Sequence, residues 1–116
     1  MFIDTMAKFA ELRARVDHPN FGLTLDIGHL HCQGEPIGES IRRCRERLWN
    51  VHIEDMKRGV HEHLMFGDGE IDFNEVFAAL RQIGYLGGVF VELSRHSHMA
   101  VDAARQALEF LNAHRV

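Results

Sequence analysis

The chain has 116 residues, which predicts one domain over residues 1–116. Its formal net charge of −4 disfavours nucleic acid as a partner, and no apolar run is long enough to span a bilayer. Cys32 and Cys44 fit neither a disulfide framework nor a metal-ligand spacing, which indicates a cytoplasmic protein with reduced thiols.

Helical and strand patterns alternate from the N-terminus. Residues 1–15 carry an apolar stripe at helical spacing, which ends at Asp17-His18-Pro19-Asn20. Residues 21–27 form a near-continuous apolar run, typical of a strand that is buried on both faces. After a loop, residues 37–48 are predicted to form a helix whose arginine-rich face is solvated.

The second half repeats this alternation. It is predicted to contain a strand over residues 49–56, a polar loop or short strand over 57–69, and a helix over 72–83 that is capped by Asp72 or Asn74. Another strand over 89–93 and a closing helix over 97–113 follow, and helical spacing predicts that the inward residues of this last helix are Met99 or Ala100, Ala103, Ala104, Ala107, Leu108 and Leu111. Such alternation is typical of an α/β fold with a parallel sheet. We therefore expect the three main strands to be neighbours in one curved sheet, with helices on one side.

Acidic and imidazole side chains lie at the ends of the predicted strands. Asp26 ends the first strand, and we expect Gly28 to let the chain turn so that His29 returns toward it. His52 is expected to point away from the helices, with Asp55 available to orient an imidazole. Carboxylate and imidazole groups suit a divalent metal such as Mn, Zn, Co or Mg.

Each of these residues also has an ordinary structural explanation. Asp26 alone could cap a turn, and a lone histidine such as His52 is more often a satisfied core residue. Glu92 interrupts an apolar strand, where a glutamate is rarely buried without a partner, although a solvated edge strand is the alternative. His61-Glu62-His63 offers two imidazoles on one face of a strand, or belongs to a solvated loop. Residues 67–70 are interpreted as a turn.

Together these strings resemble the xylose-isomerase-like barrel superfamily, which includes sugar isomerases, sugar epimerases and the endonuclease IV type of repair enzyme. Residues 21–29 are similar to its fifth-strand motif, 50–55 to the sixth, 61–72 to the seventh and 84–93 to the eighth. The chain thus looks like the C-terminal half of a TIM barrel, with parallel strands that alternate with helices. Strands one to four, and the fourth-strand glutamate of the family, have no counterpart in it.

The resemblance implies roles for six residues. The metal ligands would be Asp26, His52 and Glu92, with Glu92 also the catalytic acid/base, and the substrate contacts would be His29, Arg58 and His63. The implied function is that of a metal-dependent isomerase or epimerase of a small sugar or hydroxy-ketone, as part of a complete barrel.

Two alternatives stay open. One is a zinc-dependent abasic-site endonuclease, in which His29 and His63 would bind further zinc ions. The other is a catalytically silent half barrel that serves oligomerisation. An unclosed parallel half-sheet leaves edges open, so we expect either a preceding half or self-association into a homodimer or larger assembly. The chain alone is expected to have little or no isomerase activity.

Overall fold

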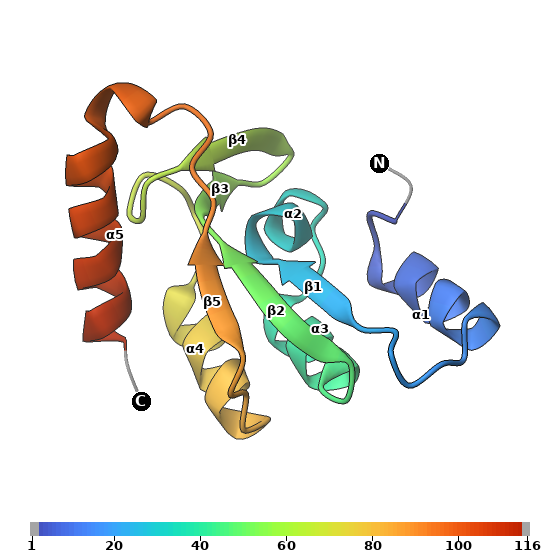
Figure 1. Cartoon of the computed structure of the whole chain (residues 1–116). Coiled ribbons are helices and arrows are strands. Elements are labelled where there is room, and N and C mark those ends of the chain that lie inside the picture. The colour runs from blue at the N-terminus through green and yellow to red at the C-terminus, as the bar shows by residue number, and fades with distance from the viewer. Residues whose placement is uncertain (1–2, 115–116) are drawn as a thin grey trace.

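Three parallel strands form the centre of the chain in the computed structural model, which describes residues 3–114 (Figure 1). They lie in the order β1-β2-β5, with bounds Leu23–Asp26, Leu48–Ile53 and Gly88–Val91. Both pairings are parallel. The predicted parallel sheet and the neighbourhood of its three strands are confirmed.

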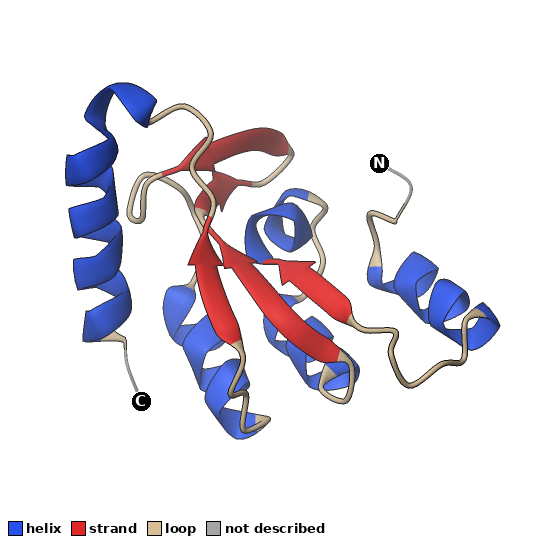
Figure 2. Cartoon of the chain, viewed as in Figure 1, coloured by secondary structure: helices blue, strands red, loops and turns tan. Residues whose placement is uncertain are grey.

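Helices cover one face of this sheet and leave the other bare. α3 and α4 lie behind it in Figure 2, while α1 and α5 flank it beside β1 and β5. The helices have the bounds α1 Met6–Arg15, α2 Ile27–Cys32, α3 Ile37–Cys44, α4 Phe73–Gln82 and α5 Ala100–Ala113, and a short 3-10 helix, η1, spans Ser97–Met99. Val51 and Ile53 of β2 are completely buried, as are Ile41 of α3 and Val76 of α4. The hydrophobic core therefore lies between the sheet and these two helices.

A β-hairpin follows β2 where the sequence predicted one longer strand and then a polar loop or short strand. β3 (Asp55–Lys57) and β4 (Val60–Leu64) pair antiparallel and lie above the strand ends in Figure 1. The Asp55 carboxylate accepts hydrogen bonds from the backbone N–H groups of Met56 (2.9 Å), Gly67 (2.9 Å) and Ile71 (3.2 Å). These bonds tie the hairpin to the loop after it, and β2 ends at Ile53 instead of continuing to residue 56.

The first three helices differ in extent from the predictions. α1 begins at Met6, where the Thr5 side chain accepts a hydrogen bond from the Lys8 N–H; residues 1–2 of the predicted helix lie outside the described residues. α2 begins directly after β1, where a loop was expected, because the Asp26 side chain accepts the His29 N–H and caps a helix. α3 was predicted to run to residue 48 but ends at Cys44, because Leu48 is already the first residue of β2.

The later helices agree more closely. Asp72, one of the two residues predicted to cap this helix, caps α4 by accepting hydrogen bonds from the N–H groups of Asn74 and Glu75. In α5, Ala103 and Ala107 are buried as expected, but Ala104 and Leu108, also predicted to face inward, are exposed, Leu108 to 60%. α5 flanks the β5 edge of the sheet (Figure 1), and within residues 3–114 no other element packs on the outer side of this helix.

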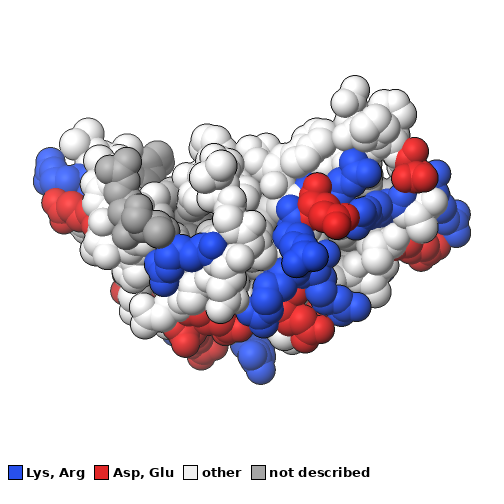
Figure 3. All heavy atoms as spheres, turned by 90° about the horizontal axis from the view of Figure 1, so that it is seen from below, with Lys and Arg blue, Asp and Glu red and all other residues white. Residues whose placement is uncertain are grey.

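Charged side chains of both signs are interspersed on the face seen from below in Figure 3. The arginine-rich face predicted for residues 37–48 is solvated, since it exposes Arg42, Arg43 and Arg45. Among residues 3–114, no helix has both the length and the apolar character that crossing a bilayer requires.

Candidate metal centre

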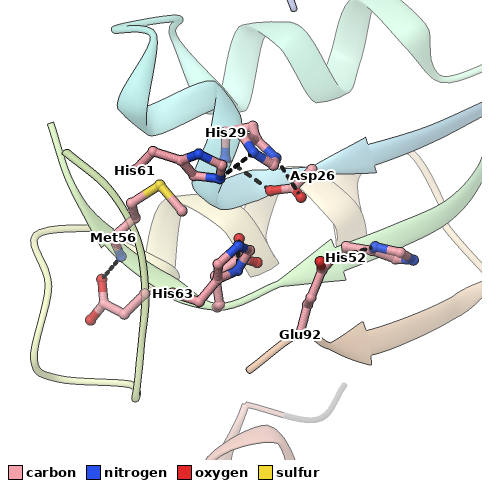
Figure 4. A network of polar contacts seen from close by, with 9 residues as sticks. Asp26, His29, His52, Met56, His61, His63 and Glu92 are labelled. Carbon is pink, nitrogen blue, oxygen red and sulfur yellow. Dashed lines mark hydrogen bonds and ion pairs between the residues drawn. The ribbon is translucent and has the colours of Figure 1, made fainter. Parts of the chain in front are cut away.

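Asp26, His52 and Glu92 converge at the ends of the three parallel strands. Asp26 ends β1 and is in register with His52 of β2, while the Glu92 N–H donates to the Ile53 carbonyl (3.2 Å) and extends the pairing of β2 with β5 by one step. One ligand atom from each of the three side chains lies within 4.8 Å of the others. Figure 4 shows the three side chains at the ends of the neighbouring strands.

The alternation of β2 explains why His52 faces this site. Val51 and Ile53 are buried against the helices, so His52 between them points to the bare face of the sheet. Its Nδ1 lies 2.9 Å from Glu92 Oε2, and the two side chains are 39% and 45% exposed. The Phe90 ring packs edge-on against the imidazole, at a centroid distance of 6.3 Å. The site is thus open to solvent and able to receive a ligand.

Glu54 is a member of this cluster that the sequence analysis did not place in the site. It is completely buried, and neither carboxylate oxygen has a hydrogen-bond partner among the described residues. Burial raises the pKa of Glu54 to about 9, and the nearby Asp26 and Glu92 carboxylates add to that rise. The only local signal is that the pair Glu54-Asp55 is flanked by the apolar residues Ile53 and Met56.

Gly28 has a different role from the one expected. It lies inside α2 and is absent from the glycines with positive φ, so it does not provide a sharp turn. Instead, a Cβ at this position would overlap the Glu54 carboxylate and come within 2.9 Å of the Met56 methyl group. Glycine is needed here because Glu54 occupies the space that a side chain would take.

Three imidazoles lie on the other side of Asp26. His29 Nδ1 is 2.6 Å from Asp26 Oδ2, and His29 Nε2 is 2.7 Å from His61 Nε2. The rings of His61 and His63 on β4 have centroids 5.4 Å apart, so the two histidines share one face of the strand. His63 Nδ1 lies 3.2 Å from Glu54 Oε1. The structure thus brings His29 and His63, both predicted to contact substrate, to the border of the Asp26 site (Figure 4).

Arg58 and Asp55 stand apart from this cluster. Arg58 lies exposed in the turn between β3 and β4, where its backbone N–H donates to Glu70 Oε2 at 3.0 Å. Within residues 3–114 no hydrogen bond or ion pair joins its guanidinium to the site, so its substrate role stays a prediction. Asp55 does not orient an imidazole as expected: its carboxylate is directed to backbone N–H groups, and a side chain at Gly69 would overlap it.

The donor set defines what the site can do chemically. Two carboxylates and one imidazole, open on one side, match the ligand types that divalent transition metals and Mg prefer and leave coordination positions for a substrate. Structural zinc sites almost always have four protein ligands, whereas catalytic sites typically have three and an open position. The arrangement therefore fits a catalytic type of metal centre better than a structural one.

Comparison with known proteins gives consistent matches. The family described as xylose isomerase-like TIM barrel matches residues 1–114. L-ribulose-5-phosphate 3-epimerase UlaE of Salmonella paratyphi C is 33% identical over 78 residues, which are 67% of this chain and 28% of that protein.

Two solved structures are also similar. D-allulose 3-epimerase from Methylomonas sp. in complex with D-allulose has a TM-score of 0.82 and 26% identity, with 98% of this chain and 44% of that chain covered. The IOLI protein with a bound zinc atom has a TM-score of 0.79 and 26% identity, with coverage of 97% and 44%. The chain therefore spans less than half the length of these relatives.

Proposed function

This chain belongs to the xylose isomerase-like TIM-barrel family, and we propose that it forms the metal-binding half of an epimerase or isomerase of a small ketose or hydroxy-ketone. The observation that carries the proposal is the convergence of Asp26, His52 and Glu92 within 4.8 Å at the ends of adjacent parallel strands. The reaction class is supported by the relatives, which are named as sugar epimerases.

Asp26, His52 and Glu92 would hold one divalent cation, Mn, Zn, Co or Mg, and their oxygen and nitrogen donors fit this group. The zinc atom bound by the IOLI protein supports a divalent cation as the occupant. When bound, such a cation supplies a Lewis acid that polarises adjacent carbonyl and hydroxyl oxygens and acidifies the C–H bond between them.

Glu92 would remove or return the proton of that C–H bond. Its side chain is 45% exposed on the bare face of the sheet, where a substrate can approach it. With one carboxylate oxygen on the cation, the other would be left to take up or return the proton. His29 and His63 at the border of the site, with Arg58 on the hairpin, would bind substrate hydroxyls.

One half barrel does not supply every group that epimerisation needs. Inversion at carbon requires an acid/base group on each side, and Glu92 provides one. The outer strands β1 and β5 each have a neighbour on one side only, and Trp49 and Phe90 are 48% and 54% exposed. We propose that a preceding half, or a second copy in a homodimer or larger assembly, covers these surfaces and supplies the second carboxylate.

A chimeric barrel tests this function. The N-terminal part of the Methylomonas D-allulose 3-epimerase, which this chain does not match, would be joined in front of the chain. We expect metal-dependent epimerisation of a ketose from a panel, little or no turnover by the chain alone, and loss of turnover in the Glu92→Gln chimera.

Glu62→Gln is the matched control, because Glu62 is exposed on β4 and the substitution removes the same charge. A folded, metal-binding chimera without turnover on any ketose would contradict the proposal. So would a Glu92→Gln chimera that is as active as the Glu62→Gln one.

A further inference from the structure

Glu54 and His63 meet where the end of β2 faces the β3–β4 hairpin. Glu54 follows β2 directly, and His63 lies on β4. Glu54 Oε1 lies 3.2 Å from His63 Nδ1, and the two side chains are 0% and 13% exposed. Neither atom has a hydrogen-bond partner among the described residues. Because most buried polar atoms in proteins are hydrogen-bonded, each of these two atoms is the available partner of the other.

The fold holds the Glu54 carboxyl group in one place. Gly28 of α2 lies against Oε1, where any Cβ would overlap it, and the same Cβ would come within 2.9 Å of the Met56 methyl group. Glu54 and Met56 are both completely buried. A buried glutamate loses the rotamer freedom that an exposed one keeps. A contact with this carboxyl group therefore restrains its partner more firmly than a contact with a surface carboxylate.

His63 lies on an element that gives its side chain little support. β4 belongs to a two-stranded hairpin, and residues 60–62 before His63 are exposed. An isolated hairpin is only marginally stable. His63 nevertheless lies at the border of the Asp26 site (Figure 4), with its ring centroid 6.1 Å from that of His29. Its Nδ1 is turned to Glu54, so Nε2, the nitrogen on the other side of the ring, is left for a substrate.

We propose that Glu54 is a positioning residue for substrate binding, which holds Nδ1 of His63 so that Nε2 binds a substrate hydroxyl. A partner on one ring nitrogen fixes both the orientation and the tautomer of an imidazole, and hence what the other nitrogen can bind. Oε1 and Nδ1 are already within hydrogen-bond distance, so a change of side-chain orientation alone completes the bond. The inference rests on the proposed function, in which His63 contacts substrate.

Nuclear magnetic resonance of the metal-free chain, with ¹⁵N in its histidines, tests the contact. We expect one tautomer of neutral His63 in the wild type, in the exposed control Glu62→Gln and in Glu54→Gln, whose amide can still bond to Nδ1. Glu54→Met, of similar length but without such a group, should show both tautomers. Thermal melting checks folding, and Glu54→Met should melt no lower than the wild type because it places no unpaired polar group in the interior. Both tautomers in the wild type, or one unchanged tautomer in Glu54→Met, overturn the inference.

Kinetics of the chimeric barrel test the role in substrate binding. Glu54→Met should raise KM for the ketose by about 10–100-fold with a smaller change in kcat, and Glu54→Gln should restore most of the loss. His63→Ala should raise KM as well, and the double variant should be no worse than His63→Ala alone, because Glu54 acts through His63. Glu54→Met should still bind Mn²⁺, since the ligands Asp26, His52 and Glu92 are intact.

The outcomes separate this inference from the proposed function. A wild-type chimera without turnover on any ketose contradicts the proposed function and removes the substrate role of His63 with it. An active chimera in which Glu54→Met keeps the wild-type KM, or in which the double variant is much worse than His63→Ala, overturns the inference alone. So does a Glu54→Met variant that no longer binds Mn²⁺, because Glu54 would then act on the cation and not through His63.

Discussion

Removal of the Asp55 carboxylate should destabilise the chain strongly, because it anchors the hairpin that carries His61 and His63. Three backbone N–H groups donate to it, at 2.9, 2.9 and 3.2 Å, and the residue is 2% exposed. Hydrogen bonds to a charged group contribute about 1.5–3 kcal/mol each. The bonds from the Met56 and Ile71 N–H groups give about 3–6 kcal/mol and the partly buried Gly67 N–H adds less, so we expect Asp55→Ala to lower the free energy of unfolding by at least about 3 kcal/mol.

Asp55→Asn is the matched comparison. Its Oδ1 can still accept from the Met56 and Ile71 N–H groups, but its amide NH₂ would face the Gly67 N–H, so the expected cost is about 1–3 kcal/mol. Urea unfolding followed by circular dichroism measures both values. An Asp55→Ala variant that loses less than about 1 kcal/mol, or an asparagine variant as unstable as the alanine one, would refute this reasoning.

Three further predictions concern buried groups. Burial raises the pKa of the Cys44 thiol to about 11, so a thiol reagent at pH 8 should modify the half-buried Cys32 quickly and Cys44 slowly, and two equally fast thiols would contradict this. The pKa of Glu54 rises from 4.5 to about 9 on folding, so the folded metal-free chain keeps a proton that the unfolded chain releases. The free energy of unfolding should therefore fall as pH rises from about 5 to 8, by at most about 1.4 kcal/mol per pH unit. Glu54→Gln should reduce this pH dependence of the free energy of unfolding, measured by urea titration. An unchanged pH dependence would show that another group causes it. Gly28→Ala should cost about 1–3 kcal/mol in thermal melts, because its Cβ would overlap Glu54; wild-type melting would show that the carboxylate moves freely.

Local patterns were sufficient to predict the sheet and the helices other than α2. The apolar run at residues 21–27 and the strand before Glu92 have no competing pattern, and helical stripes separate them. Because parallel strands end at the same edge, their terminal residues were expected to meet there. Asp26 and His52 are indeed in register, and Glu92 follows one step beyond β5.

The hairpin and Glu54 could not be predicted in the same way. Residues 55–64 are too polar for a strand signal, and their pairing depends on contacts of Asp55 with Gly67 and Ile71, which are distant in sequence. Glu54 is adjacent to Asp55, so its burial follows from that turn and not from its own neighbours alone. Leu108 was assigned inward by helical spacing, which does not reveal that α5 lies at the open edge of a half barrel.

The central claim is that Asp26, His52 and Glu92 hold a divalent cation. A crystal of the chain grown with Zn²⁺, with diffraction data collected at the zinc absorption edge, tests it most directly. The account predicts an anomalous peak bonded at about 2.0–2.2 Å to one oxygen of Asp26, one oxygen of Glu92 and one ring nitrogen of His52. An ordered site with no anomalous peak among these three side chains, at a zinc concentration that fills other sites in the crystal, would contradict it.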